Sequence, residues 1–377
     1  MPPAPLLPSF RVQGFRAFRD LEIPRLGRVN LIVGKNNVGK TTALEALKVY
    51  AAGADAPWEI RDLLERRQEI RRGSPREKTS SQIDIDRVFF QSAHSGRTSV
   101  IQLGSISGEA PLRIQAGRVS GNAPSFRPFD GAFYTADEEV PDTAQPANPV
   151  LRISLGTVPI QFASLRSLSD LHSLEVADMQ LGRLPDARTP VTCGFLPARG
   201  IDKASIGALW DSIVLTANEQ STLQALRIIA PDIERISLVE DPRQQGVRYA
   251  LIARREHASP EPLHSMGDGM NRVFELALGL VSARDGLFLI DEVENGVHYA
   301  AQEQLWRFIF EAASQLGVQV FATTHSWDCI AAFQKAASFH PEDGVLISLA
   351  QVDGDIKAAV FNERDLEIIT RESIEVR

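Results

Sequence analysis

The chain has 377 residues, enough for one large domain or two ordinary ones, and its 44% hydrophobic and 23% charged residues are typical of a soluble globular protein. It contains no run of eighteen apolar residues, which argues against a membrane span, and prolines at positions 2, 3 and 5 argue against a signal peptide. Its two cysteines have neither metal-binding nor redox spacing, and its net charge of −8 argues against a generally basic coat for nucleic acid. We therefore expect a cytoplasmic protein.

The first predicted elements are two short strands, a buried strand and a helix. Residues 10–18 and 21–23 look like two strands joined by a turn, the apolar run at 30–33 predicts a buried strand, and the spacing of the leucines predicts a helix over 42–50. Residues 34–41 read GKNNVGKT, a full match to the phosphate-binding loop G-x-x-x-x-G-K-[ST]. A strand, a glycine loop and a helix in this order surround phosphate oxygens with backbone N–H groups, so this stretch predicts nucleoside triphosphate binding.

Each fixed position of this loop has a chemical reason. Gly34 and Gly39 permit backbone angles and a close approach that a Cβ would hinder. Lys40 is expected to reach the β- and γ-phosphates, and the Thr41 hydroxyl is expected to ligate Mg²⁺. The predicted nucleotide-binding residues are Gly34, Lys35, Asn36, Asn37, Val38, Gly39, Lys40, Thr41 and Thr42.

The middle of the chain carries weaker signals. A helix-like apolar pattern at residues 58–70, with arginines and acids around it, indicates either a solvated helix with ion pairs or a patch that contacts nucleic-acid phosphates. Short alternating runs between 83 and 114 predict antiparallel strands, residues 119–149 predict a long surface insert, 151–160 return to strand, and 162–184 carry a helical leucine pattern. A strand at 192–197, one or two helices over 209–229 and a hairpin of 236–239 with 247–253 follow.

Two acids follow an apolar strand in the C-terminal third. Residues 287–290 are apolar and lead directly into Asp291 and Glu292. A buried parallel strand brings such carboxylates to the edge of an α/β sheet where ligands bind. Asp291 is expected to hold the Mg²⁺, directly or through water, and Glu292 is expected to orient and deprotonate an attacking water. Such a string recurs by chance, but together with the phosphate loop upstream it indicates a catalytic strand.

A second strand, at residues 318–324, ends at His325. The distance from Glu292 fits a strand-helix-strand crossover, which lets His325 contact the γ-phosphate. An isolated histidine in this position is more often structural, so the role depends on the two motifs above. The predicted catalytic residues are Lys40, Glu292 and His325, and the predicted metal ligands are Thr41 and Asp291.

A glycine-containing turn opens the apolar helix predicted at residues 273–281. Two glycines at a helix N-terminus expose backbone N–H groups to an anion, although an ordinary glycine turn with an N-cap reads in the same way. This anion site precedes Asp291 and Glu292 by only about twenty residues in the sequence, so it cannot easily bind the same nucleotide within one subunit. The residues of this turn are Ser265, Met266, Gly267, Asp268 and Gly269.

The order of phosphate loop, glycine signature, acidic strand and histidine resembles that of the ABC-type ATPase head. The strings look like the branch that contains RecF, the SMC proteins and the OLD-family (overcoming lysogenization defect) ATPases, and they are most similar to the OLD-like members. Residues 51–190 carry this resemblance only weakly. The matching strings are FRVQGFRAFRDLEIP (10–24), LIVGKNNVGKTTALEAL (31–47), HSMGDGMNRVFELALGL (264–280), LFLIDEVENGVHYAAQEQLWRFI (287–309), QVFATTHSWDCIAAF (319–333) and IEVR (374–377).

The resemblance implies an α/β fold of the ABC-type ATPase head, with a mixed sheet in a P-loop core lobe, an antiparallel β subdomain and a helical signature lobe. The core lobe would comprise residues 1–200, with the insert near 119–149, and residues 286–377, while residues 201–285 would form the helical lobe with its hairpin. ATP and Mg²⁺ are the implied cofactors.

The resemblance also implies a head-to-tail ATP-sandwich homodimer or a higher homo-oligomer. In such a dimer the signature of one subunit, residues 265–269, meets the nucleotide of the other. Asn295 and Gly296 occupy the place of the D-loop, which crosses to the partner. Two positions depart from the pattern. The signature lacks a Ser-Gly-Gly string, so either Ser265 or a backbone N–H replaces the usual serine contact. Arg199 stands where a glutamine normally leads into the helical lobe, and Gln82 and Gln91 are the other candidates for that glutamine.

OLD-family nucleases carry a metal-dependent TOPRIM nuclease domain behind the head, whereas the residues after His325 predict only a strand pair (345–350 and 357–361) and a helix (363–369). We therefore expect an ATPase that controls a separately encoded effector, a nuclease or toxin, in bacterial anti-phage defence. The alternative is a RecF-like DNA-repair clamp on duplex DNA, which the acidic charge balance disfavours. A transporter ATPase subunit fits the signature and residues 294–298 poorly, and no membrane partner is expected.

Overall fold

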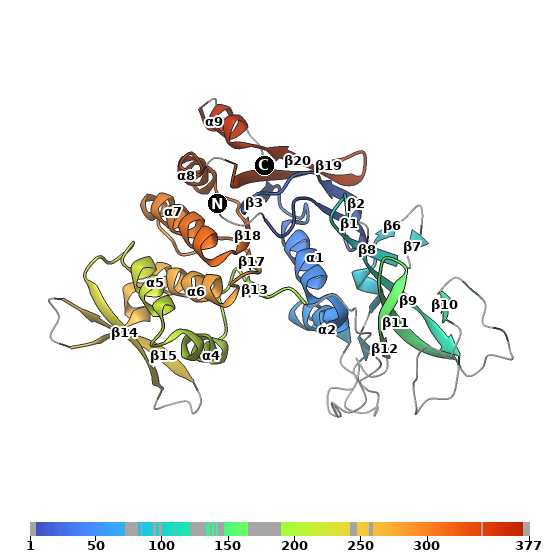
Figure 1. Cartoon of the computed structure of the whole chain (residues 1–377), viewed down its shortest axis with the longest axis horizontal. Coiled ribbons are helices and arrows are strands. Elements are labelled where there is room, and N and C mark those ends of the chain that lie inside the picture. Colours follow the sequence, from blue (N-terminus) through green and yellow to red (C-terminus); the bar gives the residue numbers. More distant parts are fainter. Residues whose placement is uncertain are drawn as a thin grey trace.

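The computed structural model of the chain describes residues 5–71, 82–83, 85–92, 96–97, 100–108, 110–120, 133–135, 138, 141, 147–164, 190–241, 247–255, 259–340 and 342–371. These residues form a mixed α/β structure with two large sheets and a helical lobe (Figure 1).

The central sheet has six strands in the order β13-β17-β18-β3-β19-β20, of which the first five are parallel and β20 is antiparallel to β19. Strand β3, from the N-terminal part of the chain, lies between two strands from the C-terminal part, so both parts build one sheet. All residues of β3 and β17 are buried, because other elements cover both faces. The strands are β3 (Val29–Gly34), β13 (Cys193–Leu196), β17 (Leu287–Ile290), β18 (Gln319–Thr323), β19 (Gly344–Val352) and β20 (Asp355–Phe361).

The second sheet has seven strands, with the path β12-β11-β9-β8-β1-β2 and β10 paired to β9, and all its pairings are antiparallel. Two further strand pairs, β4 with β5 and β6 with β7, are short. The strands are β1 (Phe10–Phe15), β2 (Phe18–Ile23), β4 (Ile70–Arg71), β5 (Gln82–Ile83), β6 (Gln91–Ser92), β7 (Gly96–Arg97), β8 (Val100–Gly104), β9 (Leu112–Ser120), β10 (Phe133–Thr135), β11 (Ala147–Leu155) and β12 (Val158–Ser164).

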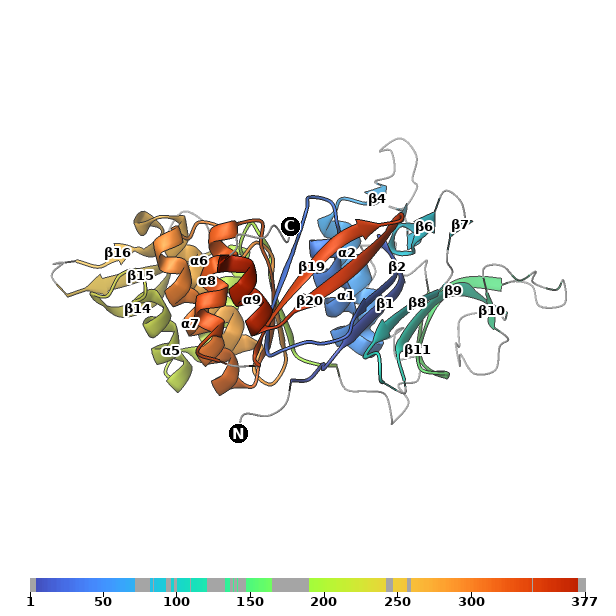
Figure 2. The same cartoon turned by 90° about the horizontal axis from the view of Figure 1, so that it is seen from above.

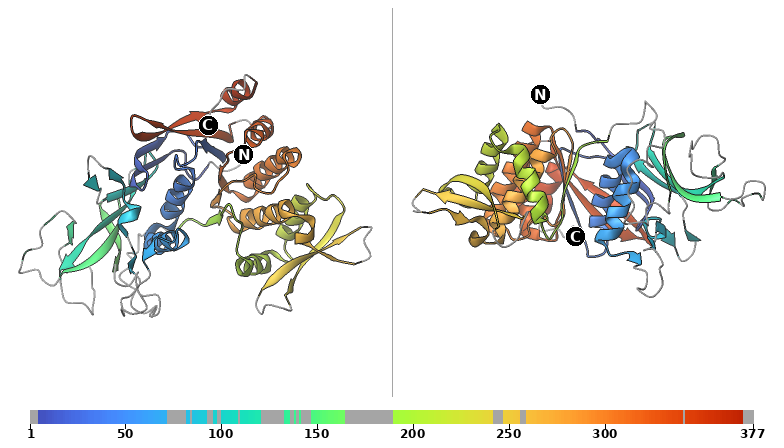
Figure 3. Two further views of the ribbon diagram at one scale, coloured as in Figure 1. Left: turned by 180° about the vertical axis from the view of Figure 1, so that it is seen from behind. Right: turned by 90° about the horizontal axis from the view of Figure 1, so that it is seen from below.

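The helical lobe lies at the end of the molecule away from the antiparallel sheet (Figure 3). It consists of α4 (Lys203–Ile213), α5 (Ala217–Leu226), the sheet of β14 (Ile233–Glu240), β15 (Arg248–Arg254) and β16 (Glu261–Pro262), and α6 (Asp268–Ser282). The remaining helices are α1 (Lys40–Ala52), α2 (Ala56–Arg66), α7 (Tyr299–Leu316), α8 (Trp327–Ala337) and α9 (Glu363–Arg371).

The two faces of the central sheet belong to two apolar cores. Because successive side chains of a strand point to opposite faces, Leu31 of β3 joins the core under α6, α7 and α8, whereas Ile32 joins the core shared by α1, α2 and the antiparallel sheet. Figure 2 shows α7 and α8 on one side of the strands and α1 on the other. The phosphate loop, between β3 and α1, therefore connects two elements that are fixed by packing.

Several element boundaries differ from those expected. The first strand ends at Phe15, because Arg16 takes a left-handed conformation (φ 49°) in the turn before β2. Residues 151–160 belong to two strands, β11 and β12, joined by a turn at Gly156 (φ 57°), and 162–164 continue β12 as strand. Residues 85–88 form a 3-10 turn where a strand was expected. The helical pattern was predicted over 162–184, and its remaining part, 165–184, lies outside the described residues, as does much of the insert at 119–149. The expected division at residues 200 and 285 stays a prediction.

Candidate functional site

The loop between β3 and α1 requires its glycines. Gly34 and Gly39 have φ of 147° and 93°, and Asn37 also has a positive φ, 63°. A Cβ on Gly34 would lie 2.5 Å from the carbonyl oxygen of Leu349. Lys35, Asn36 and Asn37 are exposed, while Val38 is buried against the fold. The loop thus presents its backbone to solvent in front of the N-terminus of α1, as an anion-binding loop needs.

The Lys40 side chain folds back over this loop. Its Nζ donates hydrogen bonds to the carbonyl oxygens of Gly34, at 2.7 Å, and Lys35, at 3.0 Å, and the residue is 6% exposed. Burial lowers the pKa of Lys40, while the carboxylates of Asp291, Glu292 and Glu294 act in the opposite direction. The result is a fixed cation between the loop and three acids, in the position expected for contact with phosphate.

Thr41 and Asp291 meet as the sequence predicted. The Thr41 hydroxyl lies 3.1 Å and 3.2 Å from the two carboxylate oxygens of Asp291, and Thr323 donates a further hydrogen bond to Oδ1 at 2.7 Å. A hydroxyl and a carboxylate are hard oxygen ligands, and Mg²⁺ is usually bound by one or two such groups together with phosphate and water. These residues fit Mg²⁺.

Glu292 sits in a constrained turn directly after β17. It has a positive φ (50°), which is uncommon for a non-glycine residue, and its backbone N–H donates to Thr323 Oγ1 at 2.9 Å. Asn295 Nδ2 donates to its carboxylate at 2.7 Å, and His325 Nε2 lies 4.0 Å from Oε1. The side chains of Glu292 and His325 are 37% and 41% exposed, so both groups are open to a substrate. The structure therefore brings the predicted Glu292, His325 and Asn295 together.

Arg272 is an important residue to which the sequence assigned no role. It is 4% exposed, and its guanidinium donates to the carbonyl oxygens of Pro197, Asp291 and Glu292. One side chain of the signature helix thus fixes the ends of β13 and β17. A cation within the glycine-rich string was visible in the sequence, but its partners depend on packing between distant segments.

Arg67 is one of the arginines for which the sequence left open an ion pair or a phosphate contact. Its guanidinium binds Glu45 through two hydrogen bonds of 2.8 Å and 2.9 Å, and Asp291 is among the charges that raise its pKa against the effect of burial. Other charged side chains of this region also have ionic partners in the same chain, as in the contacts of Glu59 with Lys48 of α1 at 2.7 Å and of Arg61 with Glu65 at 2.8 Å. This pairing favours the solvated helix over a phosphate-contacting patch for the part of 55–80 that is described.

The signature turn and the D-loop touch each other within the subunit. Ser265 and Met266 lie in a 3-10 turn, Gly267 has φ 95°, and α6 begins at Asp268. A Cβ on Gly269 would lie 2.5 Å from the carbonyl oxygen of Gly296, so the first turn of α6 packs directly on the D-loop. Across the described part of the chain, no hydrogen bond joins residues 265–269 to the phosphate loop. The structure does not bring these two predicted halves together within one subunit.

The three candidates for the missing glutamine lie in different parts of the fold. Arg199 is exposed in the loop after β13. Gln91 donates from Nε2 to the carbonyl oxygen of Asp86 at 3.0 Å, within its own turn, and Gln82 belongs to the short strand β5.

Two family models match separate parts of the chain. The model described as "AAA ATPase domain" matches residues 7–126, and the model described as "AAA domain, putative AbiEii toxin, Type IV TA system" matches residues 211–328. The first segment contains the phosphate loop, and the second contains the signature, the acids and His325. An uncharacterised protein of Methanocaldococcus jannaschii is 34% identical over 50 residues, and this match covers 13% of the chain and 23% of that relative's length.

Solved structures of SMC heads are similar to almost the whole chain. An SMC head bound to the C-winged helix domain of ScpA gives a TM-score of 0.51 at 13% identity, over 95% of this chain and 98% of that one. An SMC head with an extended coiled coil, bound to the C-terminal domain of ScpA derived from Pyrococcus furiosus, gives 0.50 at 13% identity, over 100% of both chains. This similarity confirms the α/β fold of an ABC-type ATPase head. Together with the two AAA models it indicates an ATPase. Within the described residues no helix is both long and apolar enough to cross a membrane.

Proposed function

We propose that the chain is an OLD-like ABC-type ATPase that binds and hydrolyses ATP between two subunits and thereby controls a separately encoded effector in bacterial anti-phage defence. Within one subunit, Lys40 binds the phosphates, and Thr41 and Asp291 hold the Mg²⁺, which neutralises phosphate charge when bound. Glu292, oriented by Asn295, accepts the proton of the attacking water, and His325 contacts the γ-phosphate. The distances given above support these roles.

The open signature turn is the observation that carries the dimer. Ser265, Gly267 and Asp268 are exposed, and no side chain caps the start of α6. The Met270 N–H donates to the carbonyl oxygen of Gly267, and in the described part of the chain no backbone acceptor meets the N–H of Asp268 or Gly269, which leaves these two for an anion. Tyr299, which follows the D-loop string, is 65% exposed, as is common for a large side chain that a partner covers. We therefore propose that the signature of one subunit contacts the nucleotide of the other. A higher homo-oligomer would contain the same contact.

The defence role is supported by the toxin–antitoxin wording of the family model that matches residues 211–328, together with the OLD-like strings. The effector is proposed to be a nuclease or another toxin encoded beside this chain. The RecF-like alternative gains no support from α2, where the arginines pair with acids of the same chain.

Nucleotide binding and co-purification test this proposal. The purified chain should hydrolyse ATP with Mg²⁺, and Lys40→Ala should abolish ATP binding in calorimetry, while Lys335→Ala, at a 62% exposed side chain on α8, should bind normally. Tight ATP binding by Lys40→Ala would refute the loop assignment. The product of the adjacent gene should co-purify with this chain and be toxic when released from it. A gene without any toxic neighbour would contradict the effector part alone.

A further inference from the structure

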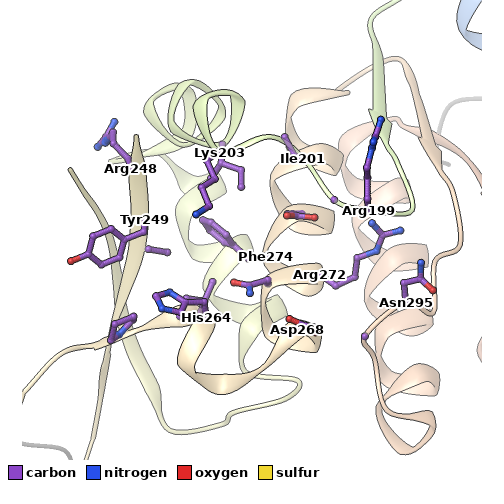
Figure 4. Close-up of a pocket in the computed structure, with 18 of the residues that line it drawn as sticks. Arg199, Ile201, Lys203, Arg248, Tyr249, His264, Asp268, Arg272, Phe274 and Asn295 are labelled. Carbon is purple, nitrogen blue, oxygen red and sulfur yellow. The ribbon is translucent and has the colours of Figure 1, made fainter. Parts of the chain in front are cut away.

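The turn that follows β17 has a firmly held backbone. Arg272 of α6 donates hydrogen bonds to the carbonyl oxygens of Asp291 and Glu292. Asn295 Nδ2 donates to the carbonyl oxygen of Ala198 at 3.1 Å, and also to the Glu292 carboxylate. Figure 4 shows Arg272 and Asn295 next to each other in the wall of a cavity of about 890 Å³ in the helical lobe. A side chain that projects from this turn therefore starts from a fixed position.

Glu294 connects this turn to the loop after β18. Its Oε1 accepts a hydrogen bond of 2.9 Å from the backbone N–H of His325, which lies 31 residues further along the chain. The carbonyl oxygen of Glu294 accepts from the N–H of Val297 at 2.9 Å, which closes the turn around the D-loop. The carboxylate thus reaches from the D-loop turn to the loop that carries the histidine.

This contact is the single hydrogen bond that the Glu294 carboxylate accepts from the described residues. Its second oxygen, Oε2, is buried and has no hydrogen-bond partner among them. An unpartnered buried carboxylate oxygen costs free energy, so a purely structural role explains this acid poorly. Burial lowers the pKa of Lys40, and Glu294 is among the carboxylates that act in the opposite direction. Glu294 therefore lies close to the predicted phosphate site.

Three successive backbone N–H groups fix the loop that carries His325. Thr324 donates to the carbonyl oxygen of Ile32 in β3 at 3.2 Å, and Ser326 donates to Thr324 Oγ1 at 3.0 Å. The N–H between them, that of His325, donates to Glu294. Only this third acceptor comes from the D-loop turn. Because the imidazole is 41% exposed, its direction depends in large part on the backbone that carries it.

We propose that Glu294 is a positioning residue for ATP hydrolysis, whose carboxylate holds the backbone of His325 so that the imidazole points to the γ-phosphate. This inference rests on the role given to His325 in the proposed function. Because Glu294 directly precedes Asn295 and Gly296, the same hydrogen bond links the D-loop to the histidine within one subunit.

Glu294→Gln and Glu294→Met make a matched pair in the full chain. Both new side chains are uncharged and similar in length to glutamate, but only glutamine offers an oxygen to the His325 N–H. Glu294→Gln should keep kcat within about threefold, because a neutral acceptor forms a somewhat weaker hydrogen bond. Glu294→Met should lower kcat about tenfold or more with little change in KM for ATP, since misplacing a reacting contact is costly. Glu303→Met, at an acid of α7 that pairs with Arg307, is the control and should change neither value.

A double-mutant cycle with His325→Ala tests whether Glu294 acts through the histidine. In that case Glu294→Met should slow hydrolysis by the unmodified chain but not by the chain that already lacks the imidazole. Labelling the seven histidines with nitrogen-15 adds a readout that does not depend on activity. The backbone amide signal of His325, identified by its loss in His325→Ala, should shift in Glu294→Met, shift less in Glu294→Gln and stay unchanged in Glu303→Met.

Three results would overturn this inference and leave the role of His325 intact. They are equal rates for Glu294→Gln and Glu294→Met, a double variant slower than His325→Ala by the full factor of Glu294→Met, and an amide signal of His325 that Glu294→Met does not move. Normal hydrolysis by His325→Ala is a different result. It would refute the γ-phosphate contact in the proposed function, and this inference with it.

Discussion

At the scale of single residues, the acids after β17 are distinguished by what holds them. Asp291 accepts from Thr41 and Thr323, so its carboxylate is fixed and faces the phosphate loop. Glu292, the next residue, has a positive φ, and its carboxylate accepts a hydrogen bond from Asn295 and lies 4.0 Å from His325 Nε2. Two adjacent carboxylates thus have different surroundings, which suits one for the metal and the other for the proton of water.

Glu292→Gln should separate binding from hydrolysis. The amide keeps the shape and can still accept from Asn295, but it cannot take a proton, so hydrolysis should be at least ~100-fold slower, the usual scale for a lost general base. ATP affinity should stay near that of the unmodified chain. Single-turnover hydrolysis and calorimetry on the same protein measure the two quantities. Unchanged turnover would remove Glu292 from the reaction.

Arg272→Lys tests the fixation of the strand ends. Lysine keeps the charge, but an ammonium group cannot reproduce the fork that binds Pro197, Asp291 and Glu292 together. We expect kcat to fall about tenfold or more with little change in KM for ATP, measured well below the unfolding temperature, because a hydrogen bond to a charged group is worth about 1.5–3 kcal/mol. Arg307→Lys, at a 40% exposed arginine of α7, is the control and should change neither value. A rise of KM with an unchanged kcat would contradict a positioning role.

At the scale of elements, the first turn of α6 and the D-loop form one packed unit. A Cβ on Gly269 would lie 2.5 Å from the carbonyl oxygen of Gly296, and a Cβ on Gly296 would lie 3.1 Å from the carbonyl carbon of Asp268. A methyl group on Gly269 would collide with a backbone carbonyl oxygen, which cannot move as the end of a flexible side chain can. We therefore expect the signature turn and the D-loop to move as one unit.

Gly269→Ala and Gly207→Ala make a matched pair for this contact. Both glycines lie in helices, but a Cβ at Gly207 in α4 would meet nothing closer than Arg248 Cδ at 3.5 Å. Gly207→Ala should be neutral or raise the free energy of unfolding by up to about 1 kcal/mol. Gly269→Ala should lower it by about 1–3 kcal/mol, as overpacking does. Urea unfolding followed by circular dichroism measures both, and equal effects would show that the contact carries no constraint.

The elements that the sequence predicted correctly are those with contiguous patterns. The apolar runs of β3 and β17 are short and uniform, so the strands were located to within one or two residues, and the phosphate loop between β3 and α1 follows from eight adjacent positions. The turns at Arg16 and Gly156 were missed, because a single left-handed residue leaves little trace in the sequence. The role of Arg272 was also missed, because one of the carbonyl oxygens that it binds, that of Pro197, lies 75 residues away along the chain.

At the scale of the whole molecule, the two parts of the proposed ATP site lie in different regions of the fold. The phosphate loop, Asp291, Glu292 and His325 meet at one edge of the central sheet, whereas the signature turn begins a helix whose own partners are the D-loop and the ends of β13 and β17. Under the proposed function, each subunit therefore has two half-sites. A second subunit related by two-fold symmetry can complete both at once.

Mixed subunits give the most direct test of this division. Lys40→Ala disables the phosphate loop, and Ser265→Arg places a bulky cation at the exposed start of the signature without the internal collision that a change at Gly269 would cause. Each variant alone should be nearly inactive. An equimolar mixture should regain about a quarter of the wild-type rate, because random pairing gives half heterodimers and each of these has one intact composite site.

The control mixture combines Lys40→Ala with Glu292→Gln, two changes on the same side of the composite site. Every site in that mixture has a defective phosphate loop or a defective acid, so no activity should return. Coupled-enzyme assays of ATP hydrolysis over a range of mixing ratios measure both cases, with a maximum near equal amounts expected only for the first. Recovery in the control would mean that Lys40 and Glu292 of different subunits serve one site, which contradicts the proposed division. Full activity of Ser265→Arg alone would mean that each subunit hydrolyses ATP by itself, and the exposed start of α6 would then have to serve another ligand.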